Sequence, residues 1–211
     1  MTLYADISGI SAHIERRIGR IHMVFHEIVS DDLHIDVYHV KSSLLRRFEV
    51  LVTSGMSAFP MSVPVESHEP RFAEIVTVLP RGWPLAEEAF ADERHYWPVR
   101  LMKTLARLPH QGHTWLGFGH TVANGASEGA MKPYADGTKL CAAALLPPSS
   151  LGRDFWCMKR QNEPEIFFWA AVPLYLSELD FKIENGIDPL LDLFDKNGVT
   201  DKIDPERASV V

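Results

Sequence analysis

Residues 114–125, TWLGFGHTVANG, gather three glycines, two aromatic rings and a histidine in twelve positions. Such a segment could cradle a phosphate, carry a catalytic histidine or form a tight turn. A dinucleotide-binding loop needs Gly-x-Gly-x-x-Gly directly after a strand, but after Gly117 and Gly119 the place of the third glycine holds valine, and no Gly-Lys-Ser/Thr sequence occurs. The sequence therefore predicts a turn whose glycines allow positive φ and close backbone approach, with Trp115 and Phe118 anchoring it in the core.

The candidate nucleophiles lack neighbours that would activate them. Gly55-x-Ser57 resembles a nucleophile elbow, but Phe59 stands where a second glycine must allow close packing of strand and helix. Cys141 lies in an apolar run, where burial disfavours the thiolate, and Cys157 has no partner nearby in the sequence. We therefore expect no covalent catalysis.

Ten histidines make a metal site the main alternative to a chain without catalysis. His22 and His26 have the i, i+4 spacing that can ligate zinc from a helix, although the metalloprotease motif places its glutamate between the two histidines, and here it follows the second. His34 and Asp36 point the same way from a strand, and His120 could converge on them. Two alternatives follow: a metal-dependent enzyme using these last three residues, or histidines that bond to nearby carboxylates and backbone.

The bulk composition indicates a globular protein that binds neither nucleic acid nor membranes. The 211 residues are 46% apolar and 23% charged, which suits one domain. The formal net charge of −7 and the pI of 5.8 argue against a phosphate backbone as ligand and suit a basic protein partner. The first residues lack a signal-peptide core, and no window approaches the roughly 18 apolar residues of a membrane span. We expect a cytoplasmic protein with reduced cysteines and no cofactor.

The elements that would position the candidate residues follow a mixed order along the chain. Apolar residues recur every three or four positions from Ile10 to Ile28, which predicts an N-terminal helix over residues 8–29. A second helix is expected from Pro98 to Pro109. Strands are predicted at 33–40, 48–56, 71–80, 138–148 and 165–175, and two C-terminal helices at 177–185 and 188–198, the latter ended by a glycine at 198. Adjacent strand pairs favour an α+β fold, in which helices pack on a mixed, largely antiparallel sheet, as one domain over residues 1–211.

Several sequence blocks, in this order, resemble the Suppressor-of-fused domain family. They are LVTSGMS at 51–57, WPVRLMKTLAR at 97–107, the Gly-His turn at 119–120 and LLPP at 145–148, and the similarity runs from about residue 32 to 208. The resemblance implies a mixed α/β fold and a binding role without catalysis. Eukaryotic members hold Gli-type transcription factors by capturing an extended peptide between two domains.

The chain departs from the eukaryotic pattern in two respects. It has the length of one domain, and the turn that reads Gly-Asp-His in eukaryotic members lacks the acidic residue between Gly119 and His120. It is more similar to short bacterial members, many of which resemble immunity proteins of polymorphic toxin systems. An acidic inhibitor suits a basic toxin, because opposite potentials steer association. The resemblance therefore implies an immunity-type protein. The alternative is an intracellular regulator or scaffold, which binds a transcription factor or forms a homodimer.

We predict that a partner binds the concave surface around the turn at 110–125 and the strand at 34–38. Exposed glycine backbone in the turn could pair with an incoming strand, while polar and aromatic side chains form the rim. The predicted contact residues are His34, Asp36, Tyr38, Trp97, Trp115, Gly119 and His120. The alternative is that both tryptophans are wholly buried and the histidine only pins the turn.

Overall fold

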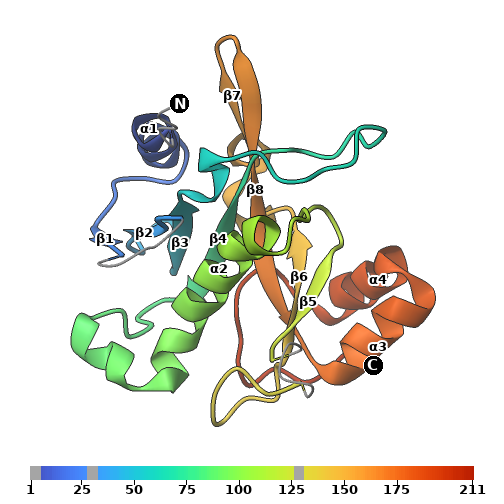
Figure 1. Ribbon diagram of the computed structural model, residues 1–211. Coiled ribbons are helices and arrows are strands. Elements are labelled where there is room, and N and C mark those ends of the chain that lie inside the picture. Colours follow the sequence, from blue (N-terminus) through green and yellow to red (C-terminus); the bar gives the residue numbers. More distant parts are fainter. Residues whose placement is uncertain (1–5, 28–32, 126–130) are drawn as a thin grey trace.

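The computed structural model describes residues 6–27, 33–125 and 131–211, which form one eight-stranded sheet with helices on both faces (Figure 1). The strands are β1 (Met23–Phe25), β2 (Asp36–Val40), β3 (Phe48–Ser54), β4 (Ala73–Pro80), β5 (Thr121–Ala123), β6 (Ala142–Leu146), β7 (Cys157–Arg160) and β8 (Glu163–Leu174). The helices are α1 (Ile7–Arg17), α2 (Glu93–Gln111), α3 (Leu176–Asn185) and α4 (Ile187–Asn197).

The strand order is β1-β2-β3-β4-β8-β6-β5, and β7 forms a hairpin with β8. The pair of β4 with β8 is parallel, and every other pair of named strands is antiparallel. The predicted α+β fold with a mixed, largely antiparallel sheet is therefore confirmed.

The two faces of the sheet are covered by different helices. Helix α2 crosses one face, while α1 packs over the β2–β4 half of the other face and α3 with α4 over its β6–β8 half (Figure 1). In β6, Ala143 and Leu145 face α2, whereas Ala142 and Ala144 face α3 and α4. This double coverage explains why β6 is a continuous apolar run rather than an alternating one. No helix of the described residues is long and apolar enough to span a membrane.

The predicted N-terminal helix over 8–29 is too long. Helix α1 ends at Arg17, and Gly19, with φ of +140°, adopts a conformation that L side chains rarely take. The chain then extends and forms β1, whose Phe25 pairs with Val37 of β2. Ile28 lies outside the described residues.

Helix α2 is longer at both ends than its prolines indicated. It begins at Glu93, because the carboxylate of Asp92 accepts the backbone N–H of Arg94 at 2.9 Å and caps the first turn. Both Pro98 and Pro109 lie inside the helix, which ends at Gln111. Its last turn leads into the glycine segment, so α2 places that segment beside the sheet.

A buried carboxylate holds the turn that follows β3. Glu74 of β4 has no exposed surface, and its Oε1 accepts the backbone N–H groups of Gly55 and Ser57, each at 3.0 Å, and the Ser57 hydroxyl at 2.6 Å. Its Oε2 accepts the Thr53 hydroxyl at 2.6 Å. Gly55 has φ of +134°, and a Cβ there would lie 2.0 Å from the carbonyl oxygen of His34. The block Thr-Ser-Gly-Met-Ser is therefore structural, and its serine is committed to Glu74.

Candidate functional site

Apart from Trp97 of α2, the predicted contact residues lie on two separate parts of the sheet. The residues at 34–38 belong to β2 or precede it, whereas Trp115, Gly119 and His120 lead into β5. Strands β3, β4, β8 and β6 separate β2 from β5, which corresponds to roughly 24 Å along the sheet at about 4.8 Å per strand. Figure 1 shows the two groups of strands on opposite sides of the molecule. The prediction of one shared concave surface was wrong, because the sequence does not reveal the strand order.

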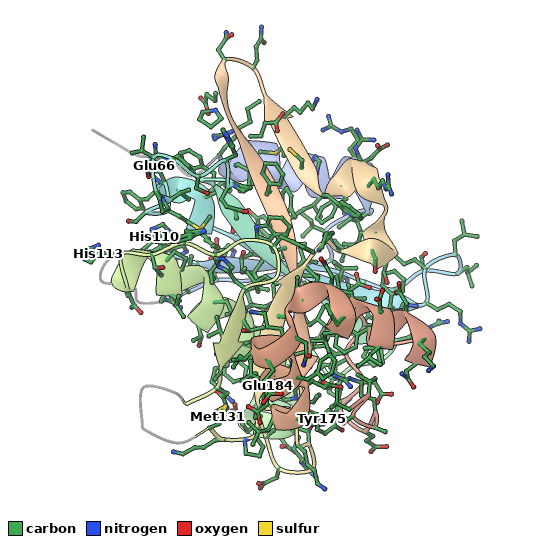
Figure 2. The ribbon with its side chains drawn as sticks, turned by 90° about the vertical axis from the view of Figure 1, so that its right-hand side faces the viewer. Glu66, His110, His113, Met131, Tyr175 and Glu184 are labelled. Carbon is green, nitrogen blue, oxygen red and sulfur yellow. The ribbon has the colours of Figure 1, made fainter. Side chains whose placement is uncertain are left out.

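A pocket of about 640 Å³ lies between α2 and β5. Its walls are the inner turns of α2, the segment 114–116 and the whole of β5, together with Lys182 of α3. Trp115 and His120 both line it, with their ring centroids 5.5 Å apart in a T-shaped contact. In Figure 2, His110 and His113 mark the C-terminal end of α2, from which the chain continues into this wall. The volume falls in the usual range for ligand pockets, about 300–1,000 Å³.

Two buried hydrogen-bond donors in the pocket wall have no partner among the described residues. They are the indole Nε1 of Trp115 and the hydroxyl of Tyr134. Burial, together with the neighbouring Cys141, raises the pKa of Tyr134 above its ordinary value, so the phenol stays a neutral donor. A buried polar group without a partner costs about 1–3 kcal/mol. Both donors are therefore unsatisfied within the packed wall of the pocket.

The pocket opens beside a free edge of the sheet. Strand β5 pairs with β6 alone among the described strands. The carbonyl of His120 accepts the N–H of Leu145, and the N–H of Asn124 donates to the carbonyl of Cys141. The backbone polar groups of His120 and Asn124 that make these bonds therefore point toward β6. The antiparallel ladder alternates, so the N–H and C=O groups of the intervening Thr121 and Ala123 face outward. An edge of this kind can accept a further strand.

The glycines of the turn do not offer the free backbone that the sequence predicted. The N–H of Gly119 donates to the carbonyl of Leu145 at 2.8 Å, so it already belongs to the sheet. Its φ is +73°, and a Cβ there would lie 3.2 Å from Ile187, which confirms the predicted need for glycine. At Gly117 a Cβ would lie 2.6 Å from the Glu69 carboxylate. The backbone that is left unpaired belongs instead to the edge of β5, a short strand inside the glycine segment that its pattern did not reveal.

Only part of the predicted contact set is accessible. Trp97 is 1% exposed and stacks on Tyr134, with ring centroids 4.9 Å apart. Tyr38 is also buried, at 5% exposure. Trp115 is half-buried, whereas Phe118, predicted to anchor the turn, is 42% exposed. The anchoring prediction was therefore wrong for Phe118, and of the two tryptophans only Trp115 can contact a partner.

The histidines and the carboxylate at β2 do cluster, but with a different third member. His26 and His34 both contact Asp36, and these three residues form the metal-competent cluster of the described chain. His120 is not among them; it lines the pocket beside β5. The expectation that His120 converges on His34 and Asp36 was wrong. The sequence did indicate His26 as a possible ligand, through its i, i+4 spacing from His22, but that spacing was assigned to a helix. In the structure His26 follows strand β1.

The structure offers no activated nucleophile among the described residues. Ser57 is buried and donates to Glu74. Both cysteines are free thiols. Burial raises the pKa of Cys141, and burial together with the carboxylate of Glu165 raises the pKa of Cys157 to about 12.

We expect Cys157 to react slowly with thiol reagents at pH 8. A thiol with a pKa of about 12 is ionised in only about one molecule in 10,000 at that pH. Alkylation by iodoacetamide, followed by mass spectrometry, should be at least about a hundredfold slower than for free cysteine. Labelling at the rate of free cysteine would show that the pKa of Cys157 is not raised.

The sequence model of the family described as Suppressor of fused protein (SUFU) matches residues 31–208. No curated protein matches the chain.

Solved structures share the fold at low sequence identity. One is a homologue of suppressor of fused from Neisseria gonorrhoeae FA 1090, with a TM-score of 0.66 and 17% identity over 97% of this chain and 96% of that chain. The structure of the Sufu–Fu complex gives a TM-score of 0.61 and 15% identity over 99% of this chain and 91% of that chain. Drosophila Suppressor of Fused gives 0.63 and 16% over 98% of this chain and 51% of that chain.

Proposed function

Because the chain belongs to the Suppressor of fused family, we propose that it works by binding another protein, as an immunity-type inhibitor that neutralises a toxin. The Sufu–Fu complex shows a domain of this fold bound to a protein. The described residues contain no activated serine or cysteine. A protein that acts by binding its partner in a stoichiometric complex needs no activated serine or cysteine.

The observation that carries the proposal is the free edge of β5 beside a pocket with unpaired donors. Main-chain hydrogen bonds to an added strand supply affinity, while a pocket beside the edge selects a side chain. Here Thr121 and Ala123 offer the edge, and Trp115 and Tyr134 offer donors without partners. A segment of the partner that pairs with β5 satisfies the edge, and a carbonyl or carboxylate that it places in the pocket reaches the two buried donors once the wall shifts to expose them.

Charge acts on two scales in this proposal. The net charge of −7 attracts a basic protein over long distances. The ionised side chains in the pocket wall, Arg100 and Lys182, are cationic instead. Arg100 is held by Glu93 and by the carbonyl of Tyr134, and Lys182 contacts the Thr121 hydroxyl at 3.4 Å. We therefore expect a basic partner whose docking segment itself carries an acidic or carbonyl-rich anchor.

The proposal is tested with the toxin domain of a neighbouring reading frame in the native genome. Co-expression should restore growth to cells that make the toxin, and the purified proteins should form a 1:1 complex by size exclusion with light scattering. If the toxin stays active in the presence of excess protein, the immunity role is wrong. If the protein alone forms a homodimer through β5, a second copy is the occupant of the edge.

A further inference from the structure

Apart from the β5 pocket, a second site lies at the opposite edge of the sheet, where β1 meets β2. We propose that His26, His34 and Asp36 bind a zinc ion, or a similar divalent transition metal ion. This inference does not rest on the proposed function. It rests on how the register of two strands brings three ligand atoms together.

The backbone explains why these three side chains converge. His34 and Asp36 are two positions apart in extended chain, so they project from the same face. The register of β1 with β2 pairs Phe25 with Val37, so the next residue, His26, lies opposite Asp36. Two imidazoles therefore flank one carboxylate from both sides.

The distances are short enough for one ion. His26 Nδ1 lies 3.1 Å from Asp36 Oδ2, and His34 Nε2 lies 2.8 Å from Asp36 Oδ1. The three ligand atoms all lie within 4.8 Å of one another. In a tetrahedral zinc site with bonds of about 2.0–2.1 Å, ligand atoms are about 3.3 Å apart. The side chains of His26 and His34 are 70% and 52% exposed, so both rings are free to make the small closing movement.

Neighbouring groups hold the carboxylate in place for this role. The side chain of Asp36 is 11% exposed, and its Oδ1 also accepts the backbone N–H of Glu27 at 3.2 Å. The carboxylate of Glu27 in turn accepts the N–H of Ile35 at 3.1 Å and pairs with Arg107 of α2. The segments that carry the ligands are therefore tied to each other and to α2, as outer contacts around metal ligands commonly are.

The ligand types select the ion. Two imidazoles and one carboxylate suit zinc and related transition metals, whereas magnesium and calcium prefer oxygen ligands. Three protein ligands on an exposed edge leave a fourth position for water, the arrangement of open zinc sites. The hydrogen bonds to Asp36 require protons on His26 Nδ1 and His34 Nε2, since a carboxylate only accepts. Zinc would bind His26 Nδ1 and His34 Nε2 in place of these protons. In the neutral rings the protons would then lie on His26 Nε2 and His34 Nδ1.

The test is calorimetric titration of the untagged protein with zinc chloride. We expect one zinc ion per chain, no binding of magnesium or calcium, and a loss of affinity of at least about tenfold in His26→Gln, His34→Gln and Asp36→Asn. His68→Gln, which changes an exposed histidine outside the cluster, is the matched control and should bind as the wild type does. Nitrogen chemical shifts of His26 and His34 should show the change of tautomer when zinc is added.

Metal-free melting curves identify any variant that does not fold. If Asp36→Asn is unfolded, the two histidine variants decide the question, because their rings are exposed and unneeded for packing. The proposal is overturned if the wild type does not bind zinc, if His34→Gln binds it unchanged, or if His68→Gln loses it equally.

Discussion

Replacing Glu74 by alanine should lower the free energy of unfolding by about 4 kcal/mol or more. The carboxylate accepts four hydrogen bonds from Thr53, Gly55 and Ser57, and Glu74 has no exposed surface. Alanine leaves these donors buried without an acceptor, at about 1–3 kcal/mol each. In a chain of this size, this loss lowers the melting temperature by about 8–16 °C. Urea denaturation followed by circular dichroism measures it, and a change within about 1 kcal/mol would contradict the assignment.

Glu74→Gln is the matched control, and its effect should depend on pH. Burial raises the pKa of Glu74, in spite of hydrogen bonds that oppose the rise. The folded state therefore favours the protonated acid, so this group stabilises the fold at low pH and loses that contribution as pH rises through the folded pKa. Glutamine cannot ionise. We expect the wild type to exceed Glu74→Gln in free energy of unfolding by more near pH 4.5 than at pH 8. At every pH, the glutamine variant should lose less free energy of unfolding than the alanine variant does.

The second large effect concerns the edge strand. Thr121→Pro should weaken partner binding at least about thirtyfold, equivalent to about 2 kcal/mol, while the protein stays folded. Proline removes the N–H that faces outward from β5, whereas the bonds to β6 come from its neighbours. Proline is tolerated on edge strands where its nitrogen faces solvent. The dissociation constant of the toxin complex and the melting temperature of the free protein separate the two effects.

Thr121→Val is the control for the edge strand, since it keeps the backbone N–H and changes only the side chain. It should bind within a few-fold of the wild type. If valine and proline weaken the complex equally, the side chain of Thr121 matters rather than the strand edge. If neither does, the partner binds elsewhere.

The sequence predicted the sheet well where burial made the pattern strong. The five strands β2, β3, β4, β6 and β8 all lie within the predicted strand ranges or close to them, because most of their residues are buried and apolar positions recur along each of them. The failures are short elements at the edges. Ile18, Ile21 and Phe25 keep a helical spacing, yet Gly19 breaks the helix and Phe25 belongs to β1. A strand of three residues carries too few alternating positions to be recognised.

The candidate site was predicted only in part, for a topological reason. Trp115 and His120 do line a pocket, and His34 and Asp36 do contact each other. Their placement in one site failed because strand order is a long-range property: β8 inserts between β4 and β6 and keeps β2 distant from β5. The buried donors of Trp115 and Tyr134 could not be foreseen either, because their lack of a partner depends on packing around them.

The most direct test of the central claim is hydrogen exchange at β5. The amides of Thr121 and Ala123 face outward in the free protein and should exchange fast there, while the amide of Val172 in buried β8 exchanges slowly. On adding the toxin partner, we predict strong protection of Thr121 and Ala123 and a change at the indole N–H of Trp115. Unchanged exchange at β5 together with new protection at another surface, such as β1 and β2, would contradict the claim that this edge binds the partner.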